Sequence, residues 1–84
     1  MKHSASPGFW ERYRALRADT CELADKSFRL LEADPSHPSL QLKKLGRVWS
    51  VRVGLHYRAI GTEVEGGFLW IWIGTHAEYD KLRT

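Results

Sequence analysis

The chain has 84 residues, 43% of them hydrophobic, and a net charge of +3, which favours one folded domain over residues 1–84 and leaves no room for a second. The single cysteine, Cys21, excludes an intramolecular disulfide and a cysteine-based metal cluster. The longest apolar run, residues 68–73, is far shorter than the ~20 residues of a membrane-spanning helix, and the first six residues lack the apolar stretch of a secretory signal, so we expect a cytoplasmic protein without a membrane partner.

The first part of the chain predicts two helices. Ser6 can cap a helix that Pro7 begins, and apolar residues follow at helical spacing. A second helix can be capped by Asp19 or Thr20 and has to end before Pro35. Because few residues separate the two helices, we expect an antiparallel helical hairpin.

Beyond residue 38 the apolar pattern changes to alternation, which is typical of strands. The last of the strands is apolar on both faces, which predicts a central strand covered on both sides. The fold class is therefore α+β, with an N-terminal helical hairpin packed on a four-stranded, mostly antiparallel sheet and a short C-terminal helix or tail. The predicted strands are residues 40–43, 48–53, 57–60 and 68–73, and the terminal segment is 77–82.

The cations are unevenly distributed along the sequence. The segment 41–61 carries five cations and no acid, which is a plausible phosphate-binding surface. The alternative is a solvated face that keeps the protein soluble. The five cations are Lys43, Lys44, Arg47, Arg52 and Arg58.

Two of these cations are predicted to be neighbours in a hairpin. With a three-residue loop over residues 54–56, Arg52 lies directly opposite Arg58, on the face away from the core. A two-residue loop would place them on opposite faces. Adjacent like charges repel unless an anion lies between them, and the guanidinium fork suits the phosphodiester. Alternatively, each arginine pairs with an acid such as Glu63 or Glu78.

A histidine, a carboxylate and a phenol lie close together after the last strand, at His76, Glu78 and Tyr79. Histidine is the side chain best suited to exchange protons near neutral pH. The alternative for His76 is an ordinary surface residue at a strand end. No role is assigned to the other histidines, which are His37 and His56 in predicted turns and His3 in an end expected to fray.

The four tryptophans are assigned to the core. Trp70 and Trp72 are two residues apart, so they are expected to share a sheet face. If exposed, they could stack on nucleobases, but the apolar strand favours burial, as it does for Trp10 and Trp49. The sequence has no phosphate-cradling glycine loop, zinc-ligand spacing or dinucleotide fingerprint, so no cofactor or metal is expected.

Several short segments, in this order and spacing, resemble the RelE/ParE toxin superfamily, and the resemblance covers residues 8–82. The segments are 42–45 (Leu-Lys-Lys-Leu), 49–54 (Trp-Ser-Val-Arg-Val-Gly), 56–59 (His-Tyr-Arg-Ala) and 72–82, which begins Trp-Ile-Gly-Thr-His. In that family a helical hairpin is followed by the basic strands and a terminal histidine or arginine with a tyrosine.

The resemblance implies a toxin of a type II toxin–antitoxin system, neutralised by a cognate antitoxin protein. RelE-type members are ribosome-dependent mRNA endonucleases, and this metal-independent activity is the leading expectation here. ParE-type members inhibit DNA gyrase, which is the first alternative. The second is a catalytically inactive family member that acts as a binding module.

The resemblance also implies roles for single residues. Arg52 and Arg58 would stabilise the phosphate, His76 would transfer protons, and Tyr79 would stack on a base or orient the nucleophile. Many RelE-like toxins carry two lysines in the second strand where this chain has Ser50 and Arg52. Two acids near the site, at positions 78 and 80, would repel RNA and favour the alternatives. Flanking RNA phosphates would be bound by Lys43, Lys44 and Arg47.

Overall fold

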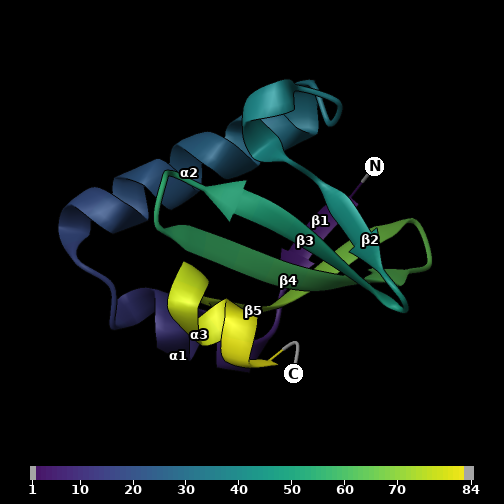
Figure 1. Ribbon diagram of the computed structural model, residues 1–84. Coiled ribbons are helices and arrows are strands. Elements are labelled where there is room, and N and C mark those ends of the chain that lie inside the picture. Colours follow the sequence, from purple (N-terminus) through teal and green to yellow (C-terminus); the bar gives the residue numbers. More distant parts are fainter. Residues whose placement is uncertain (1, 83–84) are drawn as a thin grey trace.

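The computed structural model describes residues 2–82, in which five strands form one sheet in the order β1-β5-β4-β3-β2 (Figure 1). β1 pairs with β5 in parallel, and the other three pairings are antiparallel. The α+β class is confirmed, with one strand more than the sequence predicted and with the strand predicted at residues 40–43 found at 43–45. The strands are β1 (Lys2–Ala5), β2 (Lys43–Leu45), β3 (Val48–Val53), β4 (Tyr57–Val64) and β5 (Gly67–Thr75).

The additional strand is β1, where the sequence wrongly predicted a frayed end. Its backbone approaches β5 so closely that a Cβ on Gly67 would lie 1.8 Å from the carbonyl oxygen of Lys2. Only glycine permits this approach, so Gly67 is a condition for the pairing. A four-residue segment without a strong alternating pattern gave no sign of it.

The helices are α1 (Pro7–Arg14), α2 (Ala18–Ala33) and α3 (His76–Leu82), with a 3₁₀ turn, η1, at Pro38–Leu40. As predicted, Ser6 caps α1: its hydroxyl accepts a hydrogen bond from the Phe9 amide at 3.2 Å. α2 begins at Ala18, slightly earlier than predicted. The pairings of Phe9 with Phe28 and of Tyr13 with Asp25 confirm the antiparallel hairpin.

The core lies between the helical hairpin and one face of the sheet. Val51 and Ala59, paired across β3 and β4, face Ala24 and Leu31 of α2, and all four side chains are almost fully buried. α3 packs on the opposite face (Figure 1). Helices therefore cover both faces, as the apolar pattern of residues 68–73 predicted for the last strand. Within residues 2–82 no helix has the length and apolar character needed to cross a bilayer.

Two tryptophan predictions are wrong. Ile60 pairs with Trp72 but the next residue, Gly61, pairs with Trp70, so a bulge in β5 places the two indoles on opposite faces. Trp70 is buried in the core as predicted, whereas Trp10 on α1 is 43% exposed. Because residues 68–73 are apolar on both faces, an inserted residue leaves the hydrophobic pattern unchanged, and the sequence carries no sign of the bulge.

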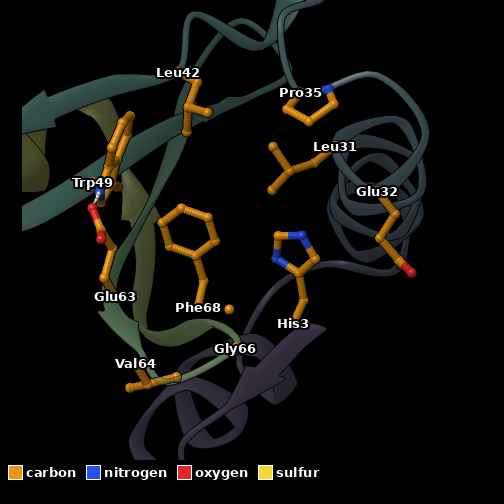
Figure 2. A pocket seen from close by; sticks show the side chains of 11 residues that line it. His3, Leu31, Glu32, Pro35, Leu42, Trp49, Glu63, Val64, Gly66 and Phe68 are labelled. Carbon is orange, nitrogen blue, oxygen red and sulfur yellow. Dashed lines mark hydrogen bonds between the residues drawn. The ribbon is translucent and has the colours of Figure 1, made fainter. Parts of the chain in front are cut away.

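His3 on β1 packs into the structure and has a specific partner. Its ring stacks on Phe68, and its Nδ1 accepts a hydrogen bond from the Trp70 indole Nε1 at 3.0 Å. The ring lines a pocket of about 460 Å³ on the face covered by the helical hairpin (Figure 2). Arg52 and Arg58 lie on the other face. Burial lowers the pKa of His3, an effect that the nearby Glu32 opposes. The hydrogen bond requires the neutral ring.

We predict that stability falls in acid because of His3. Its folded-state pKa lies below its ordinary value of 6.5, so the unfolded chain binds the proton more tightly, and the free energy of unfolding decreases as the pH falls below about 6.5. The free energy of unfolding, measured with urea between pH 5 and 8, should depend less steeply on pH in His3→Phe than in wild type. The control, His56→Gln, removes an exposed imidazole. Equal slopes for wild type and His3→Phe would contradict the assignment.

Candidate functional site

The two arginines of the basic segment are neighbours, as the sequence predicted. Residues 54–56 form a three-residue turn, in which Gly54 adopts a φ of +64°, a conformation that favours glycine. This turn places Arg52 directly opposite Arg58 in the β3–β4 register. Both side chains lie on the face opposite the helical hairpin, because the alternate residue Val53 is buried in the core.

Arg58 is buried, which the sequence did not indicate. Its side chain is 3% exposed; Nε donates to the hydroxyl of Ser50 at 2.7 Å, and Nη2 donates to the carbonyl oxygen of Gln41 at 3.0 Å. Gln41 adopts a left-handed conformation, with a φ of +43°, which costs about 1–3 kcal/mol for a residue other than glycine. The phenol ring of Tyr79 lies with its centroid 5.2 Å from the guanidinium carbon.

Arg52 is half-buried, and its Nε donates back to the carbonyl oxygen of Gly54 at 3.0 Å. The acids proposed as alternative partners for the arginines have other contacts. Glu63 accepts a hydrogen bond from the Trp49 indole at 2.6 Å, and Glu78 pairs with Arg12 at 3.0 Å. Both named acids are therefore engaged with other side chains.

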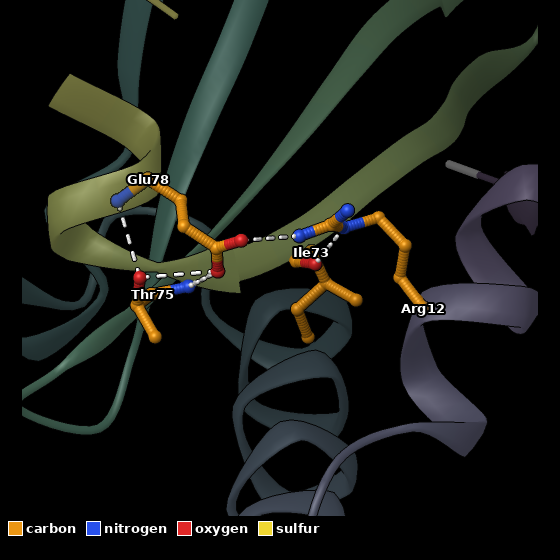
Figure 3. Close-up of polar contacts among 4 residues, drawn as sticks. All are labelled: Arg12, Ile73, Thr75 and Glu78. Carbon is orange, nitrogen blue, oxygen red and sulfur yellow. Dashed lines mark hydrogen bonds and ion pairs between the residues drawn. The ribbon is translucent and has the colours of Figure 1, made fainter. Parts of the chain in front are cut away.

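α3 begins with a capping box that a Thr-x-x-Glu pattern could have revealed. The Glu78 amide donates to the Thr75 hydroxyl at 3.1 Å, and the Thr75 amide donates to Oε1 of Glu78 at 3.0 Å (Figure 3). The hydrogen bond from the Thr75 backbone is the main cause that holds the pKa of Glu78 below its ordinary value. The carboxylate of Glu78 therefore serves α3 and Arg12.

His76 and Tyr79 stand on the first turn of α3. The His76 amide donates to the carbonyl oxygen of His56 at 2.7 Å, which ties α3 to the β3–β4 turn. The His76 side chain is 51% exposed, and its Nδ1 lies 3.2 Å from Oδ2 of Asp80. Its ring packs edge-on against Tyr79, with 5.8 Å between centroids. Arg58, Tyr79 and His76 thus follow one another in contact across this face.

The three cations expected to bind RNA do not form one patch. Lys43 pairs with Ser50, which places it on the arginine-bearing face. Lys44 lies on the other face, where its Nζ is 3.8 Å from Glu63. Arg47 is exposed in the turn between β2 and β3.

An apolar hollow of about 410 Å³ adjoins Tyr79 on the arginine-bearing face. The sequence did not indicate this hollow, because its walls come from three strands and α3. Among residues 2–82 no group of three histidine, cysteine or acidic side chains is placed to hold a metal ion. The hollow is lined by Leu45, Gly46, Val48, Ile60, Tyr79 and Leu82.

No family model matches the sequence, and a search of curated proteins finds no match. Solved structures do match the fold. The YoeB/ParE toxin from Agrobacterium tumefaciens superposes with a TM-score of 0.69 at 19% identity, over 90% of this chain and 99% of that one. The RelB–RelE antitoxin–toxin complex from Methanococcus jannaschii gives a TM-score of 0.73 at 10% identity, over 96% and 99% of the two chains.

The DinJ–YafQ complex from E. coli gives a TM-score of 0.69 at 14% identity, over 92% of this chain and 94% of that one. The likenesses span nearly the whole of each chain, and their low identities make them evidence of fold. The chain therefore has the fold of the RelE/ParE-type toxins, as the resemblance in its sequence implied.

We predict that the hydroxyl of Ser50 stabilises the fold through Arg58. Ser50 is fully buried, so in Ser50→Ala the Nε of Arg58 loses this acceptor in a place where water does not replace it. A hydrogen bond to a charged group contributes about 2 kcal/mol, and urea unfolding should show a loss of this size. The control is Ser36→Ala, which removes an exposed hydroxyl. A loss no larger than that of the control would contradict the account of Arg58.

Proposed function

We propose that the chain is the toxin of a type II toxin–antitoxin system and that it cleaves mRNA on the ribosome. The fold supports the toxin role. The observation that carries the nuclease role is the row of Arg52, Arg58, Tyr79 and His76 on one face of the sheet. RNA cleavage by the 2′-hydroxyl needs a proton acceptor and a positive charge at the phosphate, and this row offers both.

His76 is the proposed proton acceptor. When its Nδ1 carries the proton and donates to Asp80, the other ring nitrogen, Nε2, keeps its lone pair. Nε2 can then take the proton of a 2′-hydroxyl. The oxygen attacks the phosphorus, the bond to the 5′-oxygen breaks, and that oxygen takes a proton from water. Tyr79 is only 3% exposed, so its ring is too covered to stack on a base; it is proposed instead to help orient the nucleophile by holding the His76 ring, against which it packs.

The two arginines are proposed to stabilise the phosphate in different ways. Arg52 is half-buried at the edge of the turn and uses Nε for the Gly54 carbonyl, so its terminal nitrogens are proposed to bind the phosphate. Arg58 is covered by Tyr79 and acts as a fixed charge beneath the site, where solvent screens it less. Lys43 extends the positive surface on the same face, and Arg47 lies at its margin.

The proposed partner that neutralises the toxin is a cognate antitoxin protein. The RelE protein of M. jannaschii was solved with its antitoxin RelB, and its structure matches 96% of this chain. An apolar hollow beside Tyr79 also offers surface that such a partner could cover. The reaction uses side chains alone, and we propose no cofactor or metal.

A specific observation favours a second candidate, a toxin of this fold that binds its target without cleaving RNA. Arg58 is 3% exposed and already donates to Ser50 and Gln41, so a phosphate reaches it only if Tyr79 moves. One such target is DNA gyrase, because its inhibition needs no histidine and tyrosine pair.

The test of the nuclease is brief induction of the chain in bacteria, followed by primer extension on cellular mRNA. We expect new mRNA ends and a rapid stop of protein synthesis. His76→Ala should lower cleavage by about 10²–10⁴-fold, since it removes the proton acceptor. Arg52→Ala should lower it by about 10²–10³-fold through the lost charge. Lys26→Ala, on the exposed side of α2, is the control.

Other outcomes distinguish the rival functions. Intact mRNA with an induced DNA-damage response would favour gyrase inhibition. Harmless expression of soluble protein would favour an inactive binding module. Full cleavage by both His76→Ala and Arg52→Ala would contradict the assignment of the site.

A further inference from the structure

Arg12 of α1 connects the helical hairpin to the arginine-bearing face of the sheet (Figure 3). β1 pairs only with residues 67–70 of β5, so within the described chain residues 71–75 form a sheet edge. Arg12 lies at this edge, where its Nε donates to the carbonyl oxygen of Ile73 at 2.7 Å. Its guanidinium carbon is 4.9 Å from the ring centroid of Trp72, which lies on the arginine-bearing face.

The same guanidinium holds the carboxylate that caps α3. Nη2 of Arg12 donates to Oε2 of Glu78 at 3.0 Å, while Oε1 of Glu78 accepts hydrogen bonds from the amide and hydroxyl of Thr75 at 3.0 and 3.1 Å. Oε2 of Glu78 thus pairs with Arg12, and Oε1 caps α3. A planar fork can bind the strand carbonyl and the carboxylate together, which a lysine could not do.

Residue 74 has to be glycine for this contact to form. A Cβ on Gly74 would lie 2.6 Å from the Trp72 ring and 3.0 Å from Nη2 of Arg12. The bare backbone lets the indole and the guanidinium stack against the strand. Residues 72–75 therefore form the surface that binds Arg12, directly before α3 begins.

α3 depends on such contacts because it is short. Its seven residues are too few for a helix that is stable alone. His76 and Tyr79 both stand on its first turn, where the capping box and Arg12 act. Proton transfer and in-line attack become much slower when the reacting groups are displaced by about 1 Å. A mobile first turn of α3 would therefore misalign the site and leave the rest of the fold intact.

We propose that Arg12 is a positioning residue for RNA cleavage: through Glu78 it fixes the first turn of α3, and with it His76 and Tyr79, over the arginine-bearing face. This inference rests on the proposed nuclease function. Arg12 acts on the rate of the chemical step and leaves the binding of the RNA unchanged.

The experiment measures single-turnover cleavage of ribosome-bound mRNA at increasing toxin concentration for wild type, Arg12→Ala, Glu78→Gln, the double variant and Arg14→Ala. Glu78→Gln keeps the shape of the side chain and weakens its pairing with Arg12. Arg14 is exposed on the same helix and is the matched control. Urea unfolding gives the folded fraction of each variant, so that rates are compared per folded molecule.

We expect Arg12→Ala to lower the maximal rate by at least about 10-fold, with the half-saturating concentration within about twofold of wild type. The double variant should be no slower than Arg12→Ala, because the two residues act through one contact. The amides of α3 should exchange faster in Arg12→Ala than in Arg14→Ala.

Three outcomes would overturn the inference. The first is a maximal rate for Arg12→Ala equal to that of Arg14→Ala. The second is a loss confined to the half-saturating concentration, which would assign Arg12 to RNA binding. The third is independent losses that multiply in the double variant. If wild type and Arg14→Ala both leave the mRNA intact, the proposed nuclease function itself fails, and the positioning role fails with it.

Discussion

The buried guanidinium of Arg58 joins more parts of this fold than any other polar group described above. It binds the hydroxyl of Ser50 on β3 and the carbonyl oxygen of Gln41 beyond η1, and it lies under the ring of Tyr79 on α3. A buried charge is tolerated only where its hydrogen-bonding groups are met. This requirement accounts for the strained backbone of Gln41 and for the position of α3 against Arg58. The candidate site is built on top of the same charge.

This arrangement separates the positive charges of the site into fixed and accessible ones. Arg58 supplies a charge that cannot move, whereas Arg52 lies at the edge of the turn. The acids in the neighbourhood are used elsewhere, since Glu78 caps α3 and binds Arg12, and Asp80 lies against the ring of His76. Glu78 and Asp80 therefore leave the face positively charged. The sequence of residues 76–82 alone did not indicate this, because it shows the acids without their partners.

The sequence predicted those features that depend on local periodicity. The bounds of β3 and the three-residue turn follow from alternation and from glycine at position 54, and together they place Arg52 beside Arg58. The pairing of β1 depends on a distant glycine, and the bulge in β5 depends on how β4 and β5 meet, so neither has a local signal. The burial of Arg58 depends on where α3 packs. The capping box of Thr75 and Glu78 does have a local Thr-x-x-Glu pattern, from which the sequence alone can predict it.

The proposed nuclease acts through the face bearing Arg52 and His76 and uses the 2′-hydroxyl of the substrate as its nucleophile. The most direct measurement uses two ribosome-bound mRNAs that differ only in a 2′-deoxy substitution at the cleaved nucleotide. We expect the all-ribose mRNA to be cut, leaving a 2′,3′-cyclic phosphate, and the substituted mRNA to stay intact. Equal cleavage of both would contradict this mechanism, because the nucleophile would then be water, and cleavage of neither would show that this face does not catalyse the reaction.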